Sequence, residues 1–240
     1  MRRDYAKETE SRAAWIKQTL KAAGLDAVVF GASGGKDAAL TGILCRRACE
    51  NVMGIIMPCE SSRNFAADKD DALLLAKQFD IAHIVVDLTS AKATMINAIN
   101  MPLIAAASTN IAPRLRMVAL YAVAAQRSAL VAGTSNASEA YMGYFTKWGD
   151  GGCDFNPIAD LTVTEIFEFL EYLGASKVFY TKAPSAGLFD GQTDEEEMGI
   201  TYAEIDSYLL DGIAGPNFDK MQRAHDISSH KRLPIKKYPN

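Results

Sequence analysis

Residues 31–38 read Gly-Ala-Ser-Gly-Gly-Lys-Asp-Ala, after a short apolar run and before a helix-like stretch at 36–50. A strand that leads into a glycine-rich loop and then a helix forms an anion site, because backbone N–H groups and the positive end of the helix dipole converge on one phosphate-sized space. The paired glycines let the backbone approach the anion closely. The carboxylate of Asp37 beside such a loop indicates Mg²⁺ between it and the phosphates. The spacing is not that of the Walker loop, and an ordinary glycine-rich turn is the alternative.

The composition describes an ordinary globular protein. Of 240 residues, 49% are hydrophobic and 22% charged, which suits one large domain, and we treat 1–240 as a single domain. The formal net charge of −4 disfavours a nucleic-acid-binding surface. No apolar run approaches membrane-spanning length and the first residues lack a signal core, so we expect no membrane segment and a cytoplasmic location. Cys45 and Cys49 lack a matching histidine pair, and we expect buried, reduced thiols.

Apolar strands alternate with helix-like segments through the first half of the chain. Further strands are expected at 52–57, 84–88 and 128–132, and helices at 8–23, 36–50, 65–79, 90–107 and 111–127. This alternation predicts an α/β fold, a doubly wound, Rossmann-like parallel sheet with helices on both faces. Ligands bind beyond the carboxyl ends of the strands in such sheets. The Gly31 loop, the Met57-Pro58 turn, Asp87 and the Gly133 turn all lie at that edge, so we expect them to converge on one site.

The second half of the chain follows a different pattern. Residues 147–152 are too rich in glycine for a helix or an inner strand. Capping-box patterns open two further helices, one at Thr162 and one at Thr201. Residues 182–199 form a long loop with an acidic run at 194–197, and a loop of that length in a compact domain is usually a lid or disordered. Acids in a lid over phosphates would have to turn outward or toward a cation.

A second motif, at residues 133–160, carries a family resemblance. It reads GTSNASEAYMGYFTKWGDGGCDFNPIAD, and together with the 31–38 loop it closely resembles NAD synthetase, which converts nicotinic acid adenine dinucleotide (deamido-NAD) to NAD. The loop itself is similar to that of the ATP pyrophosphatases. Further matches lie at 182–188, 192–195, 198–199, 202–206 and 230–232, so the resemblance covers essentially the whole chain. We expect no amidase-like segment before the domain, because the sequence resembles the short, ammonia-dependent form, which draws its nitrogen from free ammonia.

The resemblance implies a role for each matching position. ATP would contact the loop residues Gly31, Ala32, Ser33, Gly34, Gly35, Lys36, Asp37 and Ala38, together with Thr134 and Ser185. Mg²⁺ would bind Asp37 and Glu139. Deamido-NAD would contact Arg114, Lys147, Asp154, His230 and Lys231. Asp150 matches an acid near the reacting carboxylate, so the implied catalytic residues are Asp150 and Asp37. The family also implies a homodimer with the dinucleotide site at its interface.

The implied chemistry suits these residue types. A carboxylate resists attack by ammonia because its oxygen is a poor leaving group, whereas adenylation makes a mixed anhydride that releases AMP. Mg²⁺ and hydrogen-bond donors around the phosphates offset charge as pyrophosphate departs. Ammonia is mostly ammonium at pH 7, and a carboxylate such as Asp150 would attract that cation and accept its proton.

Each of these residues also has a structural explanation. Asp150, between two glycines, suits a turn, and Glu139 suits the first turn of a helix. Surface exposure would explain Arg114, Lys147 and His230 equally well. For Arg116, two residues further along the same helix-like segment, we prefer the interpretation of a solvated helix charge.

Two positions depart from the family pattern. Ala38 stands where the family commonly has Ser, and Val163 stands where many members have a Lys associated with the phosphates. Lys36 or Lys182 would have to replace that charge. The departures leave a second interpretation, a nucleotide-binding paralogue without turnover. A third is a different ATP pyrophosphatase such as a tRNA-thiolating enzyme, which would need a basic RNA surface and a catalytic cysteine pair.

Overall fold

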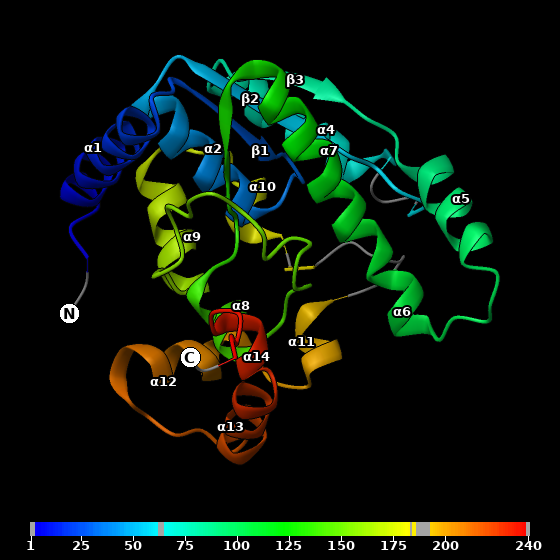
Figure 1. The fold of residues 1–240 in the computed structure, drawn as a ribbon. Coiled ribbons are helices and arrows are strands. Elements are labelled where there is room, and N and C mark those ends of the chain that lie inside the picture. The colour runs from blue at the N-terminus through cyan, green and yellow to red at the C-terminus, as the bar shows by residue number, and fades with distance from the viewer. Residues whose placement is uncertain (1–2, 62–64, 183, 186–192, 239–240) are drawn as a thin grey trace.

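A four-stranded, all-parallel sheet lies at the centre of the computed structural model, which describes residues 3–61, 65–182, 184–185 and 193–238. The strand order is β3-β2-β1-β4 (Figure 1). The strands are β1 (Ala27–Gly31), β2 (Asn51–Ile56), β3 (Ala82–Val85) and β4 (Ala129–Ala132). In the register of the sheet, Val28 of β1 lies between Val52 of β2 and Leu130 of β4. The predicted α/β fold with a parallel sheet is confirmed.

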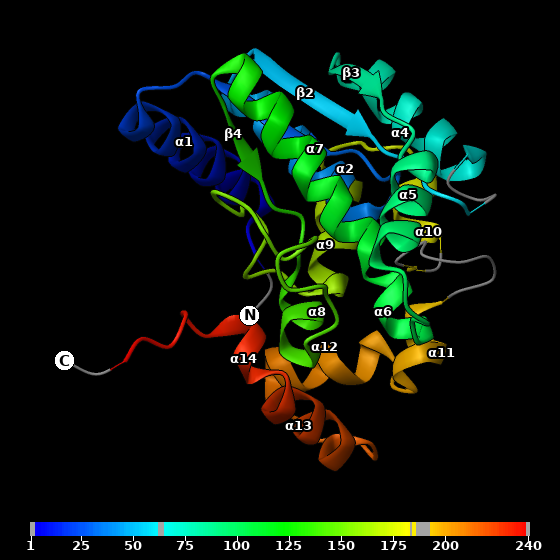
Figure 2. The same ribbon diagram turned by 45° about the vertical axis from the view of Figure 1, so that its right-hand side comes forward.

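Helices cover both faces of the sheet (Figures 1 and 2). The helices of the first half are α1 (Tyr5–Ala23), α2 (Lys36–Ala48), α4 (Ala67–Gln78), α5 (Thr89–Ile99), α6 (Ala105–Thr109) and α7 (Ile111–Arg127). Those of the second half are α8 (Ala137–Met142), α9 (Val163–Tyr172), α10 (Val178–Thr181), α11 (Asp194–Met198), α12 (Tyr202–Asp211), α13 (Phe218–Ile227) and α14 (Ser229–Arg232). No helix among the described residues is long and apolar enough to cross a membrane.

Alternating side chains of β1 divide the core into two layers. Val28 and Phe30 pack with α1, α2 and α9, and Phe169 of α9 is fully buried there. Val29, on the opposite face, packs against α7 through Leu120. Successive residues of a strand point to opposite faces, so a strand that is buried on both sides is apolar throughout. This explains why the sequence shows an unbroken apolar run before residue 31.

A third apolar cluster lies below the sheet and joins α8 and α9 to the helices of the C-terminal part (Figure 2). Val163, Tyr202 and Ile205 are among its buried members. The carboxylate of Asp206 ties the cluster together, because it accepts hydrogen bonds from the hydroxyl of Ser138 in α8 and from the backbone N–H of Thr164 in α9. These helices form the lower wall of the site described below.

Several predicted elements are confirmed, and one predicted helix is wrong. The helix at 111–127 is found as predicted, and both capping boxes are present at Thr162 and Thr201. The single helix expected at 90–107 is instead α5 and α6. Asn100 adopts a left-handed conformation with a φ of 50° and ends α5. Pro102 follows, and the residue before a proline is disfavoured in helical conformation, so the chain restarts only at Ala105.

The cysteines fit the expectation of reduced thiols. All four are free, and Cys45 is buried in the core between α2 and the sheet. Cys49 is only half-buried. Burial raises the pKa of the Cys49 thiol, which suits a structural rather than a reactive cysteine.

Candidate nucleotide and substrate site

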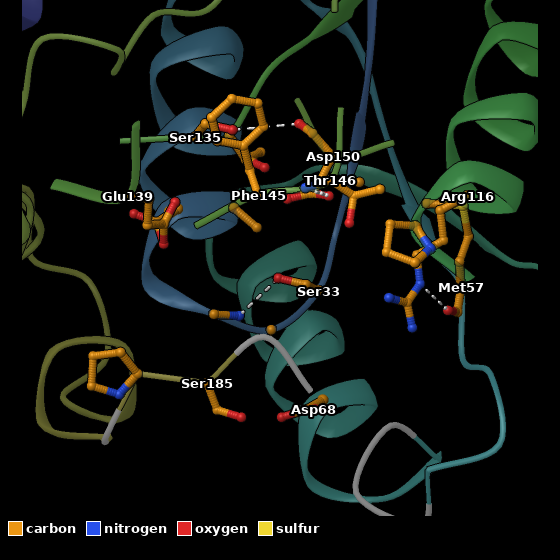
Figure 3. Close-up of a pocket in the computed structure, with 18 of the residues that line it drawn as sticks. Ser33, Met57, Asp68, Arg116, Ser135, Glu139, Phe145, Thr146, Asp150 and Ser185 are labelled. Atoms are coloured by element: carbon orange, nitrogen blue, oxygen red, sulfur yellow. Dashed lines mark hydrogen bonds between the residues drawn. The ribbon is translucent and has the colours of Figure 1, made fainter. Parts of the chain in front are cut away.

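A cavity of about 580 Å³ lies beyond the carboxyl ends of the strands (Figure 3). Its wall contains all eight residues of the 31–38 loop, the Met57-Pro58 turn and Gly133. The predicted convergence on this edge is therefore confirmed for three of its four features. Asp87 is not among the described residues that line the cavity. Its carboxylate instead accepts a hydrogen bond from the backbone N–H of Thr89 and stabilises the start of α5.

The 31–38 loop places the first turn of α2 against the cavity. Gly34 has a φ of +78°, and a Cβ at this position would overlap the carbonyl oxygen of Asp68. Gly35 caps α2, and its N–H donates to the hydroxyl of Ser33 at 3.3 Å. The N–H groups of the loop and the positive end of the helix dipole thus lie at the cavity wall, as an anion site requires. The structure agrees with the predicted strand, loop and helix.

Two carboxylates of the cavity are oriented by one asparagine that sequence reasoning did not single out. Asn136 is fully buried and donates from Nδ2 to Oδ1 of Asp37 at 3.0 Å. Its backbone N–H faces Oε2 of Glu139, and its Oδ1 accepts from the N–H of Glu139 at 2.9 Å. Glu139 is a capping-box residue of α8, as its structural interpretation predicted, and it also lies in the cavity wall, where its predicted role as an Mg²⁺ ligand stays a prediction.

The ammonium of Lys36 lies between the same two carboxylates. Its Nζ is 2.7 Å from Oδ2 of Asp37 and 3.6 Å from Oε1 of Glu139. Burial disfavours the charge of Lys36, but the charges of Asp37 and Glu139 outweigh burial and raise its pKa. Burial, and then the charge of Asp37, raises the pKa of Glu139. The three side chains form one buried charged group at the start of α2.

A third acid joins this group from the acidic run. Asp194 of α11 is buried, lines the cavity and adds to the negative charge around Lys36. The hydroxyl of Tyr202 donates to Asp194 at 3.0 Å, and the Tyr202 ring lies 5.4 Å from the Lys36 ammonium. Asp194 thus faces a cation, one of the two arrangements expected for the acidic run. Of the expected lid at 182–199, residues 183 and 186–192 lie outside the described residues, and the acidic run is part of α11 rather than of a loop.

Asp150 faces the hollow of the cavity from the glycine-rich segment (Figure 3). Its Oδ1 accepts a hydrogen bond from the N–H of Thr146 at 3.0 Å, so the residue also closes a turn. The side chain is exposed to the hollow, yet the surrounding walls remove enough water to raise the pKa of the carboxyl. Lys231 also lines the cavity, and burial lowers the pKa of its ammonium against the opposing effect of Asp150.

Arg116 corrects a prediction, because it lines the cavity rather than facing solvent. It lies on α7, and its Nε donates to the carbonyl oxygen of Met57 at 3.1 Å (Figure 3). Burial lowers the pKa of Arg116, although guanidinium remains charged in proteins. Two residues along a helix place Arg116 on a different face from Arg114, and the sequence does not show that this face meets a cavity beyond the end of β2.

Lys182 has partners of its own. Its Nζ lies 2.8 Å from Oδ1 of Asp68 and 2.6 Å from Oδ2 of Asp71, both on α4. Lys182 was one of the two lysines considered as a replacement for the missing phosphate-site lysine, and its ammonium is paired with these two acids of α4. Lys36 is held by carboxylates at the first turn of α2, next to the phosphate loop. Val163 is buried in the apolar cluster below the sheet.

The cavity brings together all ten residues that were expected to contact ATP, with Asp150, Glu139 and Lys231 beside them. Arg114, Lys147 and His230 are not among its lining residues, but hydrogen bonds connect them. Arg114 donates from Nε to the carbonyl oxygen of Lys147 at 3.3 Å, and Nζ of Lys147 donates to that of His230. Asp154 lies apart from both groups, where its carboxylate joins Tyr121 of α7 to the N–H of Val131 in β4.

Comparisons with known proteins identify relatives of this chain by sequence and by fold. The family model described as NAD synthase matches residues 8–240. The NH(3)-dependent NAD(+) synthetase of Carboxydothermus hydrogenoformans is 43% identical over 241 residues, which cover 98% of each chain. The structure of an NMN synthetase from Francisella tularensis superposes with a TM-score of 0.93 at 34% identity, covering 99% of both chains. That of the NH3-dependent NAD synthetase of Campylobacter jejuni gives 0.82 at 30% identity, covering 99% of this chain and 100% of that one.

Proposed function

This chain belongs to the NAD synthase family, and we propose that it amidates the carboxylate of deamido-NAD with ammonia to form NAD, using ATP as co-substrate. The observation that carries the proposal is the cavity in which the phosphate loop, Glu139 and Asp150 meet. A phosphate loop alone would suit many nucleotide-binding proteins. The acid that faces the hollow opposite the loop supplies the second half of a reaction in which ammonia attacks an activated carboxylate.

In the first step of the proposed reaction, the 31–38 loop holds the phosphates of ATP. The pyridine carboxylate attacks the α-phosphorus, the bond between the α and β phosphates breaks, and pyrophosphate leaves. The charge that develops on pyrophosphate is stabilised by the N–H groups of the loop and by the cations of the wall, Lys36 and Arg116. The product of this step is an acyl adenylate, a mixed anhydride.

In the second step, Asp150 attracts ammonium to the carbonyl carbon of the adenylate and accepts its proton. The nitrogen forms the new bond to carbon and loses a second proton to solvent, the bond from that carbon to the AMP oxygen breaks, and AMP leaves. A carboxylate whose pKa is raised is a better proton acceptor than an ordinary aspartate, and this is the direction found for Asp150.

Asp37 and Glu139 are suited to hold Mg²⁺ in this reaction. The proposal is supported by the convergence of one oxygen from each carboxylate on a single cation, the ammonium of Lys36. Among the described residues, no group of three or more His, Cys, Asp or Glu is placed to hold a metal ion. Two carboxylates together with substrate phosphates are the usual environment of Mg²⁺. Bound there, the ion would offset the charge of the departing pyrophosphate.

The dinucleotide would extend out of the cavity. The cavity volume of about 580 Å³ lies in the range of small-molecule sites, and Arg114, Lys147 and His230 lie outside its lining. Lys231 at the wall and the connected residues Arg114, Lys147 and His230 provide a path for the part that remains outside, and Asp154 would contact it farther along. This assignment gives all five residues the role that the family resemblance implies.

We further propose a homodimer formed through the outer face of α7. Val118 and Tyr121 lie three residues apart on this helix and are 67% and 40% exposed. Contiguous exposed apolar side chains mark interaction sites, and a self-complementary patch suits a two-fold dimer. Asp154 contacts Tyr121 on this face, so the interface would adjoin the dinucleotide. The single domain and the cytoplasmic location expected from the sequence are retained in this proposal.

The purified protein, incubated with ATP, Mg²⁺, deamido-NAD and ammonium, should form NAD, AMP and pyrophosphate in equal amounts. Glutamine that has been freed of ammonia should not replace ammonium. Normal ATP binding without NAD formation would favour the non-catalytic paralogue, whereas equal rates with ammonia-free glutamine would contradict the proposed nitrogen source.

The similarity to the Francisella tularensis NMN synthetase favours a second candidate substrate, nicotinic acid mononucleotide. Its TM-score of 0.93 exceeds the 0.82 of the Campylobacter jejuni NAD synthetase. Both substrates carry the same reacting carboxylate, so the cavity would perform the same chemistry on either. A competition assay with equal concentrations of the two acids separates the candidates, and the ratio of NAD to NMN formed gives the ratio of the two kcat/KM values.

A further inference from the structure

Lys36 occupies a position that is unfavourable for a lysine. It is the first residue of α2, where the helix dipole is positive, and it is only 7% exposed. Helices favour acids in their first turn, and burial of a charged group without a partner is costly. The charge is tolerated because Asp37 and Glu139 surround it. A lysine in such a position is expected to neutralise the charge of those two carboxylates.

Each of the two carboxylates divides its oxygens between Asn136 and Lys36. Oδ1 of Asp37 accepts from Asn136, and Oδ2 faces the Lys36 ammonium at 2.7 Å. Oε2 of Glu139 faces the N–H of Asn136, and Oε1 faces the ammonium at 3.6 Å. The two oxygens that converge, and that a metal ion would share, are therefore the two next to Lys36.

The Lys36 ammonium also has an alternative environment close by. The face of the Tyr202 ring lies 5.4 Å from Nζ, and Asp194 adds negative charge on the same side. A ring face attracts a cation. The flexible four-carbon stem of a lysine lets the ammonium move a short way while its base stays in the helix. Lys36 can thus leave the convergent oxygens without losing every stabilising contact.

We propose that Lys36 is an internal counter-cation that holds the metal-binding oxygens of Asp37 and Glu139 in the nucleotide-free protein, so that a divalent cation enters only together with nucleotide phosphates. The inference rests on the proposed metal role of these two carboxylates. The Lys36 ammonium and a divalent cation beside the same two carboxylates repel each other. The negative charge of the nucleotide phosphates offsets this repulsion, so both cations can remain when nucleotide is bound. Lys36 then contributes its charge to the phosphates, and free Mg²⁺ does not bind ahead of ATP.

The test measures Mn²⁺ binding to the whole protein by water-proton relaxation, with and without α,β-methylene-ATP, which cannot be cleaved between its α and β phosphates. We expect Mn²⁺ to bind the nucleotide-free protein at least about ten-fold more weakly than it binds the protein–analogue complex. Micromolar Mn²⁺ binding without nucleotide, lost in Glu139→Gln, would overturn the inference. This measurement needs no folded Lys36 variant.

A near-isosteric neutral variant, Lys36→Met, gives the second measurement. Without nucleotide it should bind Mn²⁺ at least about ten-fold more tightly than the unmodified protein, and with nucleotide it should bind the analogue more weakly. Lys69→Met is the matched control, because Lys69 also lines the cavity and its loss changes the net charge equally. An equal gain in Mn²⁺ affinity in both variants would show a general charge effect and contradict the role of Lys36.

The metal role of Asp37 and Glu139 and the function of Lys36 can be disproved by different results. Absence of Mn²⁺ binding even with the analogue would remove the metal role of Asp37 and Glu139 and the inference with it. NAD formation is measured independently and would still stand. Tight Mn²⁺ binding in both states would leave the metal role intact and overturn only the function of Lys36.

Discussion

The Nε of Arg116 donates to the carbonyl oxygen of Met57 at 3.1 Å, and this bond joins the inner face of α7 to the end of β2 at the cavity wall. The remaining guanidinium N–H groups stay near the hollow (Figure 3). A hydrogen bond to a charged group contributes about 1.5–3 kcal/mol. We therefore expect Arg116→Met to raise the KM for ATP by roughly ten-fold or more, as measured by steady-state kinetics.

Arg114 is the matched control for Arg116, since it lies on the same helix but outside the cavity. Arg114→Met should raise the KM for deamido-NAD and leave that for ATP nearly unchanged. If both variants shifted the same KM, the division of the two arginines between ATP and dinucleotide would be wrong.

The buried ion pair between Lys36 and Asp37 contributes to the stability of the folded protein. Asp37→Asn leaves a buried ammonium with one partner fewer, which should lower the free energy of unfolding by about 2 kcal/mol. For a chain of this size that corresponds to a fall in Tm of roughly 4–8 °C, measured by calorimetry. The double variant Lys36→Met/Asp37→Asn should recover most of the loss, because no unpaired charge remains. A double variant less stable than Asp37→Asn would contradict this pairing.

Asp150→Asn should separate activity from stability. Asparagine keeps the Oδ1 that accepts from Thr146, but it cannot take a proton from ammonium, so NAD formation should fall by at least about 100-fold. ATP-dependent adenylation should persist, which burst measurements of pyrophosphate release would detect. Loss of pyrophosphate release as well would place Asp150 in the first step instead.

The raised pKa of Asp150 gives a pH dependence with a defined sign. The folded protein holds this proton more tightly than the unfolded chain does. The corresponding stability is fully present below the ordinary pKa of 3.8 and is lost as pH rises through the raised value. Asp150→Asn should therefore melt above the unmodified protein at pH 7, with a difference that shrinks toward pH 3. A difference that grows on acidification would contradict the assignment.

Substitution of Ala38 by serine tests whether the phosphate loop lacks a useful hydroxyl group. This residue lines the cavity and is 2% exposed in the first turn of α2. Ala38→Ser should raise kcat/KM for ATP, but by less than about ten-fold, because Lys36 already supplies charge next to the loop. Steady-state kinetics at limiting ATP would measure the gain. A loss of activity would show that the hydroxyl does not reach the phosphates.

Val118→Asp tests the proposed dimer. A charge in the middle of an apolar interface should shift the protein to monomers in light scattering coupled to size exclusion, and it should raise the KM for deamido-NAD. Ile213→Asp is the matched control, since Ile213 is 59% exposed beyond the end of α12, away from α7. Dissociation by both substitutions would indicate general destabilisation rather than a specific interface.

Local patterns predicted those parts of the fold that depend on neighbouring residues. The helix at 111–127 and the capping boxes at Thr162 and Thr201 were predictable because each signal lies within one continuous stretch of sequence. The break between α5 and α6 was harder to see, because the left-handed Asn100 is not a glycine and apolar residues continue on both sides.

The candidate site was predictable in outline and not in its internal geometry. Parallel topology places the 31–38 loop and the strand ends at one edge, so the location of this loop was predictable from the alternation of strands and helices, whereas Thr134 and Ser185 were predicted from the family resemblance. Arg116 was misjudged because a helical period assigns a face to a residue but does not show what that face meets. The grouping of Lys36 with Glu139 and Asp194 depends on packing between segments more than 100 residues apart, which no local pattern encodes.

The side chain of Asn136 caps the start of α8 and also positions the carboxylate of Asp37, so one residue controls both features. Serine, threonine or aspartate can cap a helix as well as asparagine does. Of these residues only asparagine has an amide NH₂, and here that group reaches Asp37 while the carbonyl of the same side chain caps the helix. Any of the other three would leave α8 folded but release Asp37. Position 136 therefore offers a marker by which relatives that kept a working site can be told from those that kept only the shape.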